Sequence, residues 1–72
     1  MIDSIITDID SPVYHTAEYD NHGGLFLYRR DGYHVFVADI DDSDFAELRA
    51  NPNHETCEAL MGSHRCNLMC DC

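Results

Sequence analysis

The middle of the chain carries two runs of aromatic and β-branched residues. They span residues 25–30 and 33–40, and Asp31-Gly32 separates them. An Asp-Gly pair between two such runs is typical of a β-hairpin, because its two-residue turn needs positive φ angles that these residues tolerate. The pattern therefore predicts two antiparallel strands joined by a two-residue turn.

A two-residue turn fixes which residues of the two strands lie opposite each other. It places Arg29 opposite His34 and Tyr28 opposite Val35. In that register both faces of the hairpin are apolar at their centres, whereas a solvated antiparallel sheet shows one polar face. One face would hold Leu25, Leu27, Phe36, Ala38 and Ile40, and the other would hold Phe26, Tyr28, Val35 and Val37. We expect helices to cover one face and residues 2–9 to cover the other; a homodimer through the second face is the alternative.

The residues before the hairpin predict one further strand and one ambiguous segment. Residues 13–19 have the composition of a strand and lead into a loop at 20–24. Residues 1–10 fit either type of element, because their isoleucines have helical spacing whereas β-branched side chains favour a strand. Pro12 ends this segment in either case, since the residue before a proline avoids the helical region.

The residues after the hairpin predict two short helices over 44–61. Asp44 and Glu47 have the spacing of a capping box, and Asn51-Pro52 has the pattern of an N-cap followed by a first helical residue. Gly62 suits the position just after a helix, and residues 62–72 form a cysteine-bearing tail without periodicity. The chain is therefore expected to be one small α+β domain, residues 1–72. A three-stranded antiparallel meander in 13–40, with a fourth strand if 1–10 is extended, packs against the two C-terminal helices.

The chain of 72 residues is strongly acidic. It has 14 Asp and Glu against 4 Arg and no lysine, for a formal net charge of −10. Direct binding to nucleic acid is therefore excluded, because such binding neutralises several phosphates at once, and so is docking on an anionic membrane. Without a secretory signal or an apolar run of about 20 residues, we expect a cytoplasmic protein.

The carboxylates are the first candidates for a binding site. Alternate residues of an extended strand lie roughly 6.7 Å apart on one face, which is the scale of successive phosphates. A rigid set of acidic groups at that spacing could occupy a basic groove built for nucleic acid. The predicted main contact consists of Asp39, Asp41, Asp42, Asp44 and Glu47. A second patch is predicted from Asp8, Asp10 and Glu18.

Several of these acids also have ordinary structural explanations. Asp42 and Asp44 can cap a helix, and Asp20 and Asp31 are typical turn residues. A catalytic carboxylate pair would need a pocket that a chain of this size rarely encloses. We therefore expect a binding protein and not an enzyme.

The cysteines and two histidines near the C-terminus form the second candidate site. These residues are His54, Cys57, His64, Cys66, Cys70 and Cys72. Four of them, for example His54, Cys57, Cys66 and Cys70, could hold a structural zinc ion, although their spacing departs from the usual paired motifs. The alternatives are unligated thiols, disulfides of undetermined pairing, and the core of a modified-peptide precursor.

These observations predict a small acidic protein that docks on a basic surface of a nucleic-acid-handling protein and inhibits or modulates it, as a nucleic-acid mimic. Small phage-encoded inhibitors such as anti-CRISPR proteins are an analogy in size and charge alone, and would place it in the host cytoplasm. The alternatives are a zinc-stabilised domain with incidental acidity and the peptide precursor.

Overall fold

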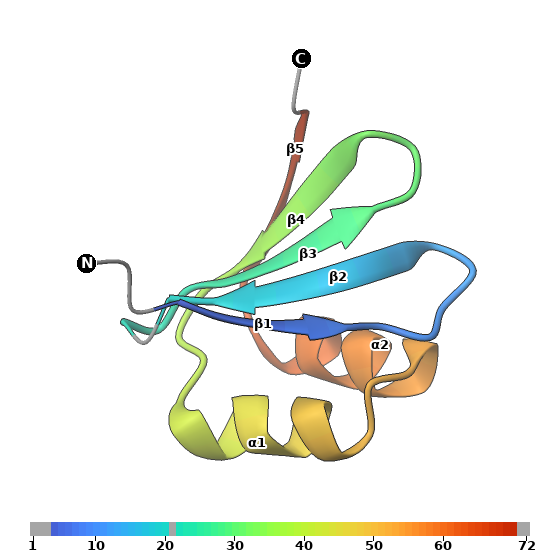
Figure 1. Ribbon diagram of the computed structural model, residues 1–72. Coiled ribbons are helices and arrows are strands. Elements are labelled where there is room, and N and C mark those ends of the chain that lie inside the picture. The colour runs from blue at the N-terminus through green and yellow to red at the C-terminus, as the bar shows by residue number, and fades with distance from the viewer. Residues whose placement is uncertain (1–3, 21, 71–72) are drawn as a thin grey trace.

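The computed structural model describes residues 4–20 and 22–70, which form an antiparallel sheet and two helices (Figure 1). The elements in chain order are β1 (Ile5–Asp8), β2 (Tyr14–Tyr19), β3 (Leu25–Arg29), β4 (Tyr33–Val37), α1 (Asp42–Ala50), α2 (His54–Ser63) and β5 (Cys66–Cys70). The predicted α+β class with antiparallel strands and two short helices is confirmed.

The sheet has five strands in the order β1-β2-β3-β4-β5, each antiparallel to its neighbours. The two helices come between β4 and β5 in the chain, and both lie on the same side of the sheet (Figure 1). They are therefore not the last elements. The tail that lacked a recognisable pattern returns to the sheet and forms a strand on the outer side of β4.

The core lies between the helices and one face of the sheet. Alternate side chains of the central strands point into it, as the period of two in a strand requires. Phe45 and Leu48 of α1, with Cys57 and Leu60 of α2, fill the opposite side. The sheet contributes Tyr14, Ala17, Tyr19, Leu25, Leu27, Val35 and Val37.

The hairpin register differs from the prediction by one residue. Leu27 pairs with Val35 and Phe26 with Phe36, so the predicted two-residue turn was wrong. Residues 30–32 form the connection instead, and Gly32 adopts a φ of +90°. Loops of this length with glycine at the left-handed position are the next most common hairpin connections. The longer loop moves Val35 and Val37 to the core side.

Segment 1–10 and the helix starts also need correction. Ile5–Asp8 is an edge strand beside β2 and covers neither face, while Ile2 lies outside the described residues. The N-cap of α1 is Asp41, whose side chain forms a capping box with Asp44, so this helix begins before residue 44. Asn53, and not Asn51, caps α2. In both cases another suitable polar residue stands within three positions of the predicted cap.

Candidate binding surfaces

Two loops meet at the end of the sheet where β2 and β4 finish. Ile40 N donates a hydrogen bond to Gly23 O over 3.0 Å, which joins the β4–α1 connection to the β2–β3 loop. In the latter loop Asp20 Oδ1 accepts from His22 N at 2.7 Å and Gly24 N at 2.9 Å. Burial alone would raise the pKa of Asp20, but these amide donors hold it below its usual value.

The Tyr19 hydroxyl group contacts one carboxylate, that of Asp42 at the start of α1, and two further carboxylates act on it through their charge. Tyr19 Oη lies 3.1 Å from Asp42 Oδ1 and 3.3 Å from Ile40 O. Burial raises the pKa of Tyr19, and the hydrogen bond to Asp42 and the charges of Asp42, Asp41 and Asp20 raise it further. Because Tyr19 is influenced by all three acids, they contribute to one local negative field. We call Asp20, Asp41 and Asp42, together with the exposed Asp39 of the β4–α1 connection, the acidic end.

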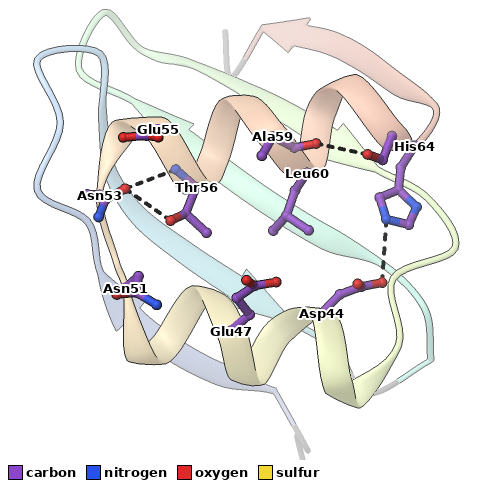
Figure 2. Close-up of a pocket in the computed structure, with 10 residues that line it drawn as sticks. Asp44, Glu47, Asn51, Asn53, Glu55, Thr56, Ala59, Leu60 and His64 are labelled. Carbon is purple, nitrogen blue, oxygen red and sulfur yellow. Dashed lines mark hydrogen bonds and ion pairs between the residues drawn. The ribbon is translucent and has the colours of Figure 1, made fainter.

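A groove of about 450 Å³ runs beside the acidic end, between α1 and α2 (Figure 2). Asp44 and Glu47 of α1 line one wall, and Glu55 and His64 lie on the other side. His64 Nε2 lies 3.4 Å from Asp44 Oδ2. The groove therefore offers carboxylate oxygens to solvent and suits a positively charged side chain.

In the described residues, no arginine forms an ion pair with the carboxylates of the acidic end within 4.0 Å. Arg29 forms a bidentate pair with Asp31, with nitrogen–oxygen distances of 3.2 and 2.8 Å, at the far end of the β3–β4 hairpin. Arg30 Nε donates to Ser11 O over 3.0 Å. Within residues 4–20 and 22–70, Arg29–Asp31 is the only arginine–carboxylate pair within 4.0 Å.

The acids of the main predicted contact lie around the start of α1, and two acids of the second patch, Asp8 and Glu18, are diagonal neighbours on one face of the paired strands β1 and β2. Asp39, Asp41, Asp42 and Asp44 follow one another around the start of α1, with Glu47 one turn later. Of the other predicted acids, Asp8 and Glu18 lie on strands β1 and β2, whereas Asp10 N donates to Pro52 O beside α2.

Asp39 and Asp41 do not lie on a strand, so the strand-like spacing expected of the carboxylates does not apply to these two. Asp39 lies beyond the end of β4 and has a φ of +61°, while Asp41 caps a helix. Asp10 likewise lies beyond the end of β1. Asp20, which the sequence indicated only as a turn residue, joins the main group because the loops meet in space.

The face of the sheet opposite the helices carries a row of rings. Phe26 lies 5.2 Å from Phe36 and 5.9 Å from His34, and Tyr28 lies 5.7 Å from His34, as measured between ring centroids. Tyr28 Oη donates to Glu18 Oε1 over 2.8 Å. Sequence analysis did not identify this row, because the predicted register placed Phe26 and Phe36 on opposite faces.

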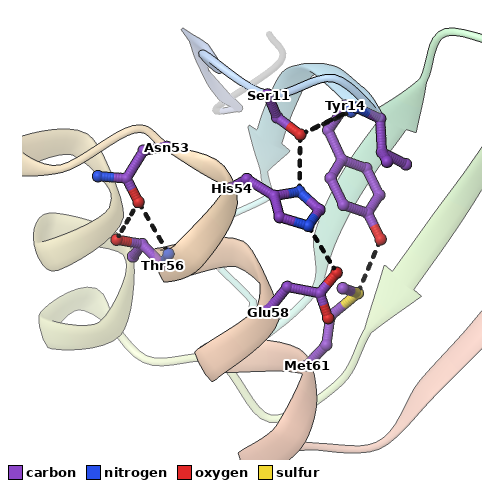
Figure 3. A network of polar contacts seen from close by, with 8 residues as sticks. Ser11, Tyr14, Asn53, His54, Thr56, Glu58 and Met61 are labelled. Atoms are coloured by element: carbon purple, nitrogen blue, oxygen red, sulfur yellow. Dashed lines mark hydrogen bonds and ion pairs between the residues drawn. The ribbon is translucent and has the colours of Figure 1, made fainter.

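A serine, a histidine and a glutamate form a polar network at the start of α2 (Figure 3). His54 Nδ1 lies 2.8 Å from Ser11 Oγ, and His54 Nε2 lies 3.2 Å from Glu58 Oε1. Ser11 is only 5% exposed, and its oxygen also accepts from Val13 N and Tyr14 N at 3.0 and 3.2 Å. Through these contacts Ser11 connects the β1–β2 loop to α2. No sequence pattern indicates this network, since Ser11 and His54 are far apart in the chain.

The predicted zinc ligands lie in different surroundings. His54 belongs to the network with Ser11, His64 contacts Asp44, and Cys57 is buried in the core. The Cys66 thiol donates to Met61 O over 3.1 Å. Cys70 occupies the position opposite Tyr33 in the sheet, and Cys72 lies outside the described residues. In the part of the chain that is described, no three His, Cys, Asp or Glu side chains are grouped to hold a metal ion.

Neither helix of the described chain is long and apolar enough to cross a membrane. Comparisons with protein-family models, with curated proteins and with solved structures found no match to this chain.

Proposed function

We propose that this protein docks, through its acidic end and the neighbouring groove, on a basic surface of a nucleic-acid-handling protein and inhibits or modulates it. The observation that carries the proposal is the grouping of Asp20, Asp39, Asp41 and Asp42 at one end of the molecule, where no described arginine pairs with them. Cationic groups of a partner would supply the missing counter-charges.

The physical basis of this binding is steering followed by local contact. A net charge of −10 draws a basic surface toward the protein over a distance set by the salt concentration. At contact, a lysine or arginine of the partner would enter the groove and meet Asp44 and Glu47. Since nucleic acid binds basic surfaces through the same kind of charge neutralisation, the two would compete.

The test begins with proteins captured from a lysate of the host by the immobilised chain. Each captured protein is then purified, and its complex with a labelled DNA or RNA duplex is titrated with the acidic protein. We expect displacement of the duplex, at protein concentrations that rise with added salt. Binding that does not respond to salt, or that leaves the duplex in place, would contradict the proposal.

Two variants of equal net charge show whether the acidic end carries the effect. The first changes Asp20, Asp39, Asp41 and Asp42 to Asn, which retains an acceptor oxygen at each hydrogen-bonded position. The control instead changes Asp8 and Asp10 to Asn, and Glu18 and Glu58 to Gln. We expect the first to weaken partner binding by about 10-fold or more and the control by about threefold or less, because contact charges act more strongly than distant screened ones. Equal losses would mean that net charge, or the predicted second patch of Asp8, Asp10 and Glu18, contributes as much as the acidic end.

A further inference from the structure

Among residues 4–20 and 22–70, no strand pairs with the outer side of β5, so backbone groups of this strand face outward in a regular order. Ala38 N donates to Arg65 O over 2.9 Å, and the β4–β5 ladder continues in that register through Cys70. Successive residues of an antiparallel strand turn their amide and carbonyl groups to alternate sides. Asn67 and Met69 therefore face β4, whereas Cys66, Leu68 and Cys70 turn their backbone groups to the outer edge.

This edge lacks the features that usually prevent strands from pairing. Proline, lysine and other charged residues are typical protections of an edge strand, and Cys66–Cys70 contains none of them. Leu68 is 59% exposed and Met69 is 47% exposed. The opposite edge of the sheet, β1, ends in Asp8 and so carries a charge of its own.

We propose that two copies of this chain pair through β5, antiparallel and centred on Leu68. In that register the backbone of Leu68 bonds to Leu68 of the second copy, and Cys66 bonds to Cys70 at each end. The outward positions are symmetric about Leu68, so all the amides and carbonyls that point away from β4 gain partners. The contact closes on itself by a two-fold axis and makes one continuous sheet from two molecules.

The charge distribution favours a second copy over a basic partner at this edge. Strands β3, β4 and β5 contain no Asp or Glu, so two copies of charge −10 approach here with their acidic groups held apart.

The pairing is independent of the proposed function and responds to salt in the opposite direction. Added salt screens the repulsion between two acidic copies, so the dimer becomes more stable. The same change weakens the attraction between the acidic end and a basic partner. A single salt series therefore distinguishes failure of one proposal from failure of the other.

Sedimentation equilibrium of the reduced protein at about 0.05 M and about 0.5 M NaCl tests the pairing. We expect a monomer–dimer equilibrium with a dissociation constant in the micromolar to millimolar range, as is usual for interfaces below about 1,200 Å². The dissociation constant should fall as salt is added. A protein that stays monomeric at the highest attainable concentration in the higher salt would overturn the proposal.

Leu68→Pro removes an outward amide without removing a bond to β4, and we expect it to raise the dissociation constant about 10-fold or more. Ile6→Pro is the matched control on β1. Because Ile9 N donates to His15 O in the same ladder, the Ile6 amide also points outward. Ile6→Pro should leave the dimer unchanged.

Circular dichroism shows whether each variant is folded. If a proline variant unfolds, Leu68→Lys and Ile6→Lys replace the pair, since lysine charges on paired edges repel each other. Dimers of undiminished affinity in the Leu68 variant would place the contact elsewhere and overturn the proposal.

Discussion

The hydroxyl of Tyr19 lies 3.1 Å from Asp42 Oδ1, to which it donates a hydrogen bond, so the end of β2 is joined to the first turn of α1. This bond places a neutral donor among the acids of the acidic end. It also fixes the helix against the sheet at the point where the two loops meet.

Tyr19→Phe removes this donor while keeping the ring that stacks on Phe45 at a centroid distance of 4.8 Å. We expect the melting temperature to fall by about 4–8 °C, the shift typical of losing one buried hydrogen bond in a domain of this size. Tyr33→Phe is the control, because the Tyr33 side chain is 40% exposed. Calorimetry showing equal shifts for the two variants would contradict this role of the Tyr19 hydroxyl.

Asp41 combines a structural role with the proposed binding role, and two substitutions separate them. Asp41→Ala should lower the free energy of unfolding by about 1 kcal/mol, because the amide of Asp44 loses its 2.8 Å acceptor. Asp41→Asn keeps an acceptor of similar capping strength and should leave stability nearly unchanged. Urea denaturation measures both. A loss of stability in Asp41→Asn equal to that in Asp41→Ala would show that charge, and not capping, stabilises this helix start.

The buried thiol of Cys57 leads us to expect that the folded protein loses stability in alkaline solution. Burial, followed by the charge of Glu58, raises the pKa of the thiol from 9.0 to about 11. As the pH rises, the Cys57 thiol therefore loses its proton in the unfolded chain before it does so in the folded protein. The stabilising contribution of the protonated thiol is complete below pH about 9 and is lost as the pH rises toward about 11. Thermal unfolding between these pH values should show a steeper decline in the wild type than in Cys57→Ala. Cys66→Ala, which changes an exposed thiol, should retain most of the wild-type slope.

Ser11→Ala tests whether the network at the start of α2 is structural. The substitution leaves the amides of Val13 and Tyr14 without their acceptor, and we expect the free energy of unfolding to fall by about 1–3 kcal/mol. Ser63→Ala, at an exposed serine, should change it by about 0.5 kcal/mol or less. Urea denaturation compares the two. If the wild type hydrolysed a test ester and Ser11→Ala abolished this turnover without loss of stability, the serine would be a nucleophile instead.

Metal removal gives a direct test of the predicted zinc site. Because Cys57, Cys66, His54 and His64 are not grouped to hold a metal ion in the described part of the chain, we expect treatment with a strong chelator to leave the melting temperature unchanged. Native mass spectrometry of the untreated protein should show the mass of the chain alone. One bound zinc ion together with a chelator-induced fall in the melting temperature would establish the alternative.

The strands of the meander were predictable because aromatic and β-branched residues alternate with turn residues there. The register was not, since Asp31-Gly32 allows either a two-residue turn or a longer loop that includes Arg30, and only packing against the helices distinguishes them. The longer loop places Leu27 and Val35 on the same buried face. A shift of one residue in the register of β3 and β4 therefore determines which side chains lie on the face that carries the aromatic rings.

The last strand and the composition of the acidic end depend on contacts that no local pattern encodes. The sequence of β5 shows no alternation of apolar and polar residues, and its strand conformation depends on pairing with β4. Asp20 joins Asp41 and Asp42 because two loops meet, far apart in the chain. The acidic composition of the chain predicted that a negative surface exists, but only the folded structure shows where that surface lies.

The position of β5 also has a consequence for local opening. β5 follows both helices in the chain, and its exposed side chains, those of residues 66–69, contribute little burial to hold it against β4. Elements with few buried contacts open at a lower free-energy cost than the core. Amide hydrogens of the isolated monomer should therefore exchange faster in β5 than in β2 or β3. Each such opening would uncover β4 while the helices and the first four strands keep their packing.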